Sequence, residues 1–143
     1  MSNSVKTKWT GNMSFEWDLD GHKVVIDADE KVGGENKGPK PKPFMLAALG
    51  GCTGMDVISM LKKMRVTEDI LDLNVEVDGV LTDEHPKYYK SMHVRYIFTA
   101  KKGVELPKAK LEKAVNLSEE RYCGVSALYK KADVKITSEI VIN

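Results

Sequence analysis

Two cysteines, Cys52 and Cys123, are the residues of this 143-residue chain best suited to chemistry. They lie far apart in the sequence, so they form no CxxC pair. The N-terminus, MSNSVKTKWT, has no apolar signal core, which argues against export and predicts a cytoplasmic protein. In a reducing compartment a structural disulfide is disfavoured, so catalytic or redox use of the thiols gains weight.

Cys123 follows Arg121 and precedes a predicted short helix over 125–131. A thiol at a helix N-terminus beside a cation has a lowered pKa, and the thiolate is the nucleophile. Local spacing therefore predicts that Cys123 is the more acidic thiol. The alternative is an ordinary residue in the first turn of a helix.

Cys52 stands among three glycines, Gly50, Gly51 and Gly54, inside a long apolar segment. Each glycine in a helix interior costs about 1 kcal/mol relative to alanine, so either another interaction offsets this cost or the segment needs close backbone approach. Gly50 and Gly54, one turn apart, would let the helices of two subunits approach each other. The alternative is that a sheet crosses the helix tightly within one subunit, with Cys52 a small buried hydrophobe.

Several other kinds of site are disfavoured. The three histidines show no ligand spacing with each other or with the cysteines, so neither a metal nor a cofactor is predicted. The chain has 22 basic and 21 acidic residues, and this balance gives no reason to expect nucleic acid as a partner. The glycine-rich loop over 31–43 lacks the GK[ST] sequence of a phosphate-binding loop.

Patterning predicts one α+β domain over 1–143, with mostly antiparallel sheets around a long buried helix. Alternating apolar and polar residues and the turn residues between them predict six strands: 5–10, 13–19, 23–27, 71–78, 88–101 and 133–142. Helices are predicted from Pro43 to Arg65, from Pro107 to about residue 120, and over 125–131.

From Phe44 to Leu61 the only charged residue is Asp56. Eighteen residues is the lower edge for a membrane span, and the glycines and the charge argue against one. A chain of this size cannot easily surround such a helix by itself. The sequence therefore predicts no membrane association and an intimate homodimer.

Two segments carry a family resemblance: GPKPKPFMLAALGGCTGMDVISMLKKM and the later ERYCGVSA. With the strand and helix order, they resemble the OsmC/Ohr superfamily of osmotically inducible and organic-hydroperoxide-resistance proteins. The resemblance implies an intertwined α+β homodimer with two central helices back to back. It also implies a thiol-dependent peroxidase, in which Cys52 attacks the peroxide and Cys123 resolves the sulfenic acid as a disulfide.

This sequence departs from the family pattern at the groups that assist the thiol. Family peroxidases place a glutamate at the start of the central helix, where this chain has Lys42 and Pro43. They also use an arginine from the N-terminal region, and this chain has none before Arg65. The candidate charge partners are then Arg121, Glu35, Lys37 and Lys42, each with the alternative of an ordinary solvated charge.

Two functions follow from these observations. The first is a hydroperoxide reductase of oxidative stress defence, for which the resemblance implies lipophilic organic hydroperoxides as substrates and a dithiol reductant such as a lipoyl protein. Its pocket would be lined by Phe44, Met45 and Met55. The second is a protein of the same fold with negligible turnover that binds a small apolar or thiol-reactive ligand.

Overall fold

A computed structural model describes all residues, 1–143, and the chain divides into two compact units, 1–45 and 46–143. The elements follow the predicted order. The N-terminal unit holds three strands, β1 (Lys6–Gly11), β2 (Ser14–Leu19) and β3 (His22–Ile26). They form an antiparallel sheet in the order β1-β2-β3. Asn12 and Asp20 adopt positive φ in the two turns, as tight hairpins between twisted strands require.

The loop after β3 is irregular, as predicted, apart from one 3-10 turn over Glu30–Val32. Asp27 organises it, because its buried carboxylate accepts hydrogen bonds from the backbone N–H groups of Ala28, Glu35 and Lys37 at 2.7, 3.1 and 3.1 Å. Burial acts to raise the pKa of Asp27, but these hydrogen bonds outweigh it and the pKa is lowered. The loop is thus held by a carboxylate that stays charged.

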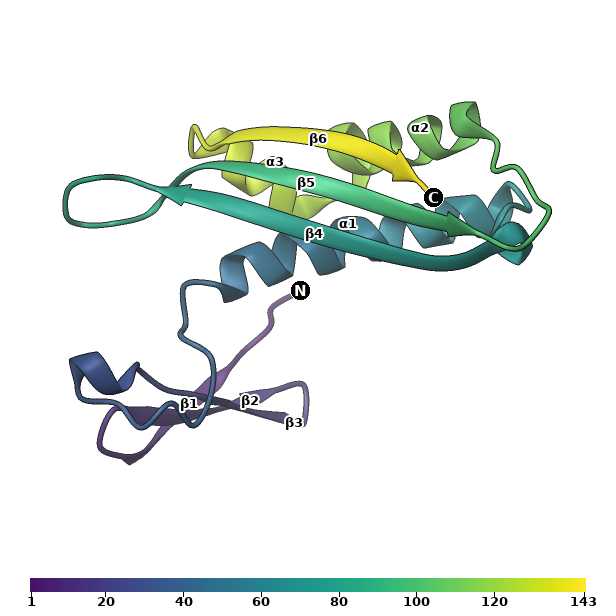
Figure 1. Ribbon diagram of the computed structural model, residues 1–143. Helices are drawn as coiled ribbons and strands as arrows, with labels where there is room; N and C mark the ends of the chain where they lie inside the picture. Colours follow the sequence, from purple (N-terminus) through teal and green to yellow (C-terminus); the bar gives the residue numbers. More distant parts are fainter. The chain divides into compact units, whose positions relative to one another are not determined.

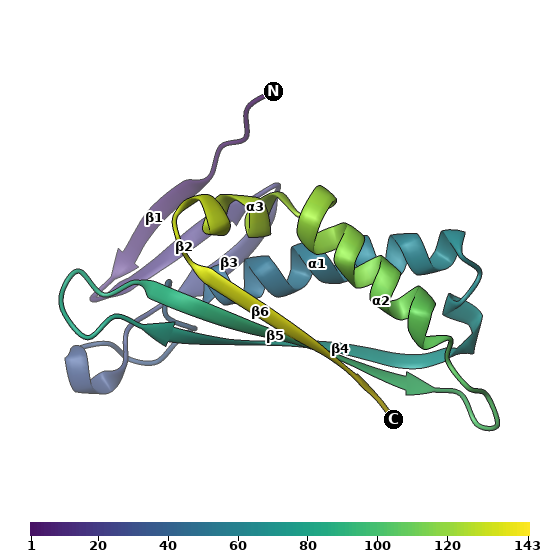
Figure 2. The same ribbon diagram turned by 90° about the horizontal axis from the view of Figure 1, so that it is seen from above.

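The second unit is a three-stranded sheet with helices on one face (Figures 1 and 2). Its strands are β4 (Ile70–Leu81), β5 (Tyr89–Ala100) and β6 (Lys135–Ile142), in the order β4-β5-β6. β4 and β5 are antiparallel, whereas β5 and β6 are parallel and are therefore joined by a crossover. That crossover contains α2 (Lys108–Leu117) and α3 (Gly124–Lys131). Of the four strand pairings in the chain, three are antiparallel, as the sequence predicts for most of the sheet.

The core of this unit lies between the sheet and the helices. The face of β5 predicted to be apolar is buried, and its members are Met92, Val94, Tyr96 and Phe98. Leu49, Val57 and Leu61 of α1 (Phe44–Lys63) join it, with Leu111 and Val115 of α2.

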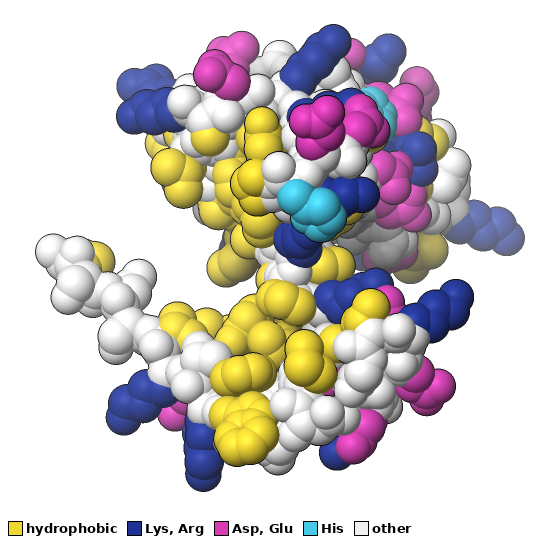
Figure 3. Space-filling model, turned by 90° about the vertical axis from the view of Figure 1, so that its left-hand side faces the viewer, with side chains coloured by type: hydrophobic (Ala, Val, Ile, Leu, Met, Phe, Trp, Pro, Cys, Tyr) yellow, Lys and Arg dark blue, Asp and Glu magenta, His cyan; other side chains and the backbone are white.

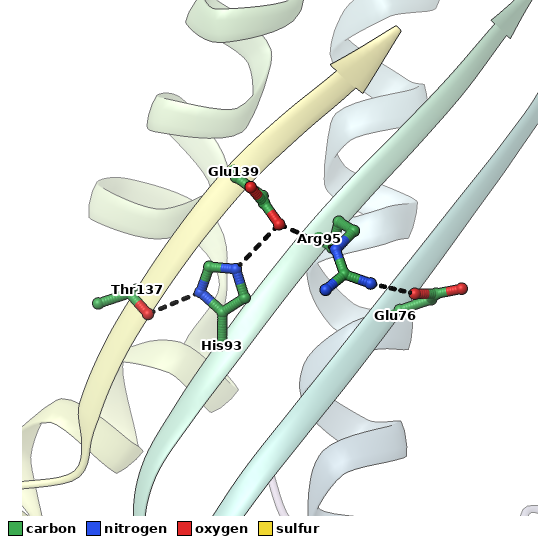
Figure 4. Close-up of polar contacts among 5 residues, drawn as sticks. All are labelled: Glu76, His93, Arg95, Thr137 and Glu139. Carbon is green, nitrogen blue, oxygen red and sulfur yellow. Dashed lines mark hydrogen bonds and ion pairs between the residues drawn. The ribbon is translucent and has the colours of Figure 1, made fainter. Parts of the chain in front are cut away.

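The opposite face of the same sheet is polar and open to solvent (Figure 4). Arg95 on β5 donates to Glu76 on β4 at 2.8 Å and to Glu139 on β6 at 2.9 Å. His93 contacts Thr137 and Glu139 on β6 at 2.8 and 3.3 Å. These side-chain hydrogen bonds and ion pairs connect the three strands on the solvent-exposed face of the sheet. The two cysteines lie on the other side, among the helices.

α1 is long and apolar enough to cross a membrane by length and composition, a test that core helices of globular proteins also pass. In this structure one side of α1 packs on the sheet, while Met55 on the other side is 77% exposed. A single copy of the chain therefore leaves one side of α1 uncovered, as expected for a chain too small to surround this helix. Figure 3 shows that hydrophobic side chains reach the surface of both units.

The glycines of α1 serve the contact with the chain's own sheet. A Cβ placed on Gly50 would lie 3.1 Å from Cγ2 of Val77, and one placed on Gly54 would lie 3.4 Å from Cγ2 of Val75. Both valines belong to β4. Within one chain the alternative of a tightly crossing sheet is therefore confirmed, and the approach of a partner helix stays a prediction. Gly51 is different, because it is exposed and a Cβ there would meet nothing within 4 Å.

Candidate active site

The two cysteines, remote in sequence, lie together in the second unit. Both are free thiols, Cys52 half-buried and Cys123 buried, with 3% of its surface exposed. Asp56 joins them, and Sγ of Cys52, Sγ of Cys123 and a carboxylate oxygen of Asp56 all lie within 4.8 Å of one another. Cys52 and Asp56 are four residues apart on α1, so one helix face presents both.

A π-helical turn brings Cys123 to this place. Residues Ser118–Tyr122 form the turn directly after α2, and the Cys123 N–H closes it by donating to the Ser118 carbonyl at 2.8 Å. Such turns are rare and often occur at functional sites. Cys123 then caps α3, and its Sγ accepts a hydrogen bond from the Ser126 N–H at 3.4 Å.

The local prediction of an acidic Cys123 is wrong. The helix N-terminus is present, but burial raises the pKa of Cys123 to about 11, with a further contribution from the neighbouring Cys52 thiol. The hydrogen bond from Ser126 acts in the opposite direction and is outweighed. Arg121 lies over the ring of Tyr122, with 5.9 Å from its Cζ to the ring centroid, and is exposed. Cys123 is therefore a buried, protonated thiol at neutral pH.

A chain of buried hydroxyl groups supports Asp56. Ser118 Oγ donates to Oδ2 of Asp56 at 3.0 Å, and Thr53 Oγ1 lies 2.8 Å from Ser118 Oγ. Thr53 Oγ1 also lies 2.7 Å from the hydroxyl of Tyr96, which donates to Oε1 of Glu119 at 3.2 Å. Burial raises the pKa of the Tyr96 phenol, so it keeps its proton.

This chain of hydroxyls fixes the carboxylate beside the thiols. Ser118 uses its one hydroxyl proton on Asp56, which leaves Oδ1 of Asp56 free for another partner. A carboxylate in that position can take a proton from a thiol or return one to a leaving oxygen. This role of Asp56 was not predicted from the sequence. The available signal was that Asp56 is the only charged residue in an apolar segment of eighteen residues.

Most of the other predicted site residues belong to the N-terminal unit and make contacts within it. Glu35 and Lys37 form an ion pair with each other in the loop of the N-terminal unit, and Lys42 is exposed. Phe44 packs edge-on against Trp17 with ring centroids 4.8 Å apart, and Met45 is exposed at the end of the N-terminal unit. Lys130, a basic residue of α3, donates from Nζ to the Glu119 carbonyl at 3.0 Å.

Met55 lines an open apolar groove on the second unit. The groove has a volume of about 610 Å³ and is formed by α1 and the start of β4. Its lining is nearly all apolar: Gly50, Gly51, Gly54, Met55, Ile58, Ile70, Leu71, Leu73 and Val75, with Thr67 and Asp72. Leu71 is 67% exposed there, so this surface is left uncovered by the single chain.

Comparison with known proteins places the chain among relatives of the same fold. A family model described as OsmC-like protein matches residues 34–139. Protein YhfA of Escherichia coli K12 is 32% identical over 134 residues, which cover 93% of this chain and 92% of that protein.

Solved structures agree with this match. The crystal structure of a hypothetical protein from Aquifex aeolicus VF5 aligns with a TM-score of 0.80 at 27% identity, covering 100% of this chain and 98% of that one. An organic hydroperoxide resistance protein OsmC from Legionella pneumophila, also described as a predicted redox protein, aligns with a TM-score of 0.69. The alignment covers 99% of this chain and 97% of the Legionella protein at 16% identity, and a similarity at this level shows the fold alone.

Proposed function

Because this chain belongs to the OsmC-like family, whose members are generally linked to peroxide or stress defence, we propose that it is a two-cysteine reductase of organic hydroperoxides. The observation that carries the proposal is the pair of free thiols, distant in sequence and within 4.8 Å at their sulfur atoms. A peroxidase of this type needs one thiol that reaches substrate and a second within reach of the first.

The burial of the two sulfur atoms supports the roles that the resemblance implies. Cys52 is partly open to solvent, whereas Cys123 is buried and has its pKa raised to about 11. The thiolate is the attacking species, so Cys123 is poorly suited to attack at neutral pH. Cys52 is the peroxidatic cysteine, and Cys123 is the resolving one.

The reaction proceeds in three balanced steps. The thiolate of Cys52 attacks the peroxide oxygen, forming an S–O bond and breaking the O–O bond, and the leaving alkoxide takes a proton to give the alcohol. Cys123 then gives up its proton, and its sulfur attacks the sulfur of the Cys52 sulfenic acid, forming the S–S bond and breaking the S–O bond. The leaving hydroxide takes that proton and departs as water. An external dithiol, such as a lipoyl protein, reduces this disulfide by two exchange steps and is itself oxidised to a cyclic disulfide.

Charge stabilisation at this site differs from that expected of the family. The pattern of a helix-start glutamate and an N-terminal arginine is absent from the sequence, and Asp56 is the ionisable side chain beside the thiols. Losing one preorganised charge-stabilising donor typically costs about 10²–10³ in rate. Turnover of cumene hydroperoxide is therefore slow but measurable, with hydrogen peroxide a poorer substrate in these apolar surroundings.

We propose further that the protein works in the cytoplasm as a homodimer, with the groove of α1 and β4 covered by a second copy. The exposed apolar side chains of Met55, Ile58 and Leu71 support this, because a contiguous apolar surface of that kind marks an interaction site. The second candidate function, binding of a small apolar ligand with negligible turnover, is favoured by the same groove. It stands only if the thiols prove unreactive.

Single-turnover kinetics tests the enzymatic proposal. We expect Cys52→Ser to abolish thiol loss in stopped-flow mixing with cumene hydroperoxide, and Cys123→Ser to keep the first oxidation while stalling recycling. A Cys52→Ser variant as fast as the wild type would reverse or remove the role assignment. A wild type no faster than free cysteine would favour the binding function.

A further inference from the structure

We propose that the reduced protein binds one thiophilic divalent cation, with Zn²⁺ as the best match, through Sγ of Cys52, Sγ of Cys123 and the carboxylate of Asp56. The spacing of the histidines argued against a zinc site in the sequence. The donor set that the fold assembles contains no histidine, and its members come from α1 and from the start of α3.

The chemistry of the donors selects the metal class. Both thiols release their protons when they bind a metal ion. The resulting thiolates are soft ligands that favour zinc and related ions over magnesium or calcium, and a carboxylate is a common third ligand of zinc. Three protein ligands leave the fourth tetrahedral position open for water. The half-buried state of Cys52 and Asp56 gives water access to that position, while Cys123 closes the inner side.

The geometry suits a single ion. Two sulfur ligands at the tetrahedral angle on one zinc ion lie about 3.8 Å apart, given a Zn–S bond length of about 2.3 Å. The three donor atoms lie within 4.8 Å of one another, so side-chain rotations that move them by about 1 Å bring them into range. Cys52 and Asp56 stand one turn apart on a twenty-residue helix, which fixes their spacing.

Two further features fit a bound cation. Ser118 donates to Oδ2 of Asp56, which is the kind of second hydrogen bond that orients a ligating carboxylate and leaves Oδ1 for the metal. No ion pair of the chain includes Asp56, so no basic side chain of the chain neutralises this carboxylate by direct contact.

Metal titration of the reduced protein tests the proposal. Anaerobic apoprotein is titrated with Zn²⁺ against a chromogenic chelator, and with Co²⁺ as a spectroscopic substitute. We expect one metal ion per chain and a thiolate-to-Co²⁺ charge-transfer band. Protein with both cysteines carbamidomethylated is the blank and should show neither. A wild type that binds no better than this blank would overturn the proposal.

Variants separate ligation from general attraction of cations. Cys52→Ser and Cys123→Ser should each weaken Zn²⁺ binding by at least about 100-fold, above the range of about 10–100-fold typical of outer-shell partners. Asp56→Asn should weaken it by at least about tenfold. Glu120→Gln is the matched control, because it removes an exposed carboxylate from the same π-helical turn that carries Ser118 without touching the hydrogen bonds around Asp56, and it should bind as the wild type does.

Two outcomes with these variants contradict the proposed set. Unchanged binding by Asp56→Asn would remove the carboxylate from the site. A loss in Glu120→Gln as large as that in Asp56→Asn would show attraction by charge alone. Circular dichroism checks that each variant is folded. The proposal does not rest on the peroxidase function, since no peroxide enters the titration and either one can fail while the other holds.

Discussion

Replacing Gly51 by leucine separates the contact with a second copy from the contact with the chain's own sheet. A side chain at Gly50 or Gly54 would meet β4, whereas a Cβ at Gly51 meets nothing within 4 Å. Gly51 lies on the exposed side of α1 and lines the same groove as Met55 and Ile58. Gly51→Leu therefore places new bulk on the proposed interface with no clash around its Cβ inside one chain.

The expected effects on the helix and on the dimer have opposite signs. Leucine in a helix interior is favoured over glycine by roughly 0.8 kcal/mol, so the free energy of unfolding of one chain should hold or rise. Overpacking at a close contact costs about 1–3 kcal/mol, which corresponds to roughly a 5- to 150-fold weaker dimer. Sedimentation equilibrium over a concentration series measures that dissociation constant.

Gly51→Ala is the matched control, because it carries the gain in helix propensity with little added bulk. The reasoning is refuted if Gly51→Leu dimerises as tightly as the wild type, since this face would then be no interface. A wild type that stays at 16.0 kDa at micromolar concentration would remove the dimer altogether.

Two further predictions concern the interior of the second unit. Thr53→Val should lower the free energy of unfolding in urea by about 1–3 kcal/mol, because it removes the buried hydroxyl that lies between those of Tyr96 and Ser118 and donates to one of them. Thr137→Val on the exposed face should change it little. In metal-free Cys52→Ser protein, alkylation of Cys123 should keep accelerating well above pH 9, because burial raises the pKa of this thiol to about 11. The raised pKa of Cys123 also adds to the free energy of unfolding. That contribution is fully present below the unfolded pKa of about 8.5 and is lost as the pH rises through 11. An alkylation rate that reaches a plateau near pH 8.5 would contradict the raised pKa and therefore both predictions.

The sequence was enough to predict the α+β class and the order of the elements, because local patterns determine both. The alternation along β5 was read correctly, and Met92 and Phe98 are buried as predicted. Turn residues placed the N-terminal hairpins at Asn12 and Asp20. The resemblance carried by the two cysteine segments is confirmed by the family match.

Reasoning from the sequence failed where one group depends on a distant neighbour. The pKa of Cys123 follows from burial, which local spacing at a helix N-terminus does not report. The purpose of Gly50 and Gly54 depends on which surface crosses α1, and the sequence left that choice open. Asp56 is held beside the thiols by a hydrogen bond from Ser118, sixty-two positions away in the sequence. Ser118 begins a π-helical turn, which no sequence pattern predicted.

The most direct test of the central claim is peptide mapping without reduction after one equivalent of cumene hydroperoxide has been added to metal-free, reduced protein. The account predicts a single product in which the peptide of Cys52 is joined to the peptide of Cys123 within one chain. Recovery of both cysteines as separate thiols, each still open to alkylation, would contradict it.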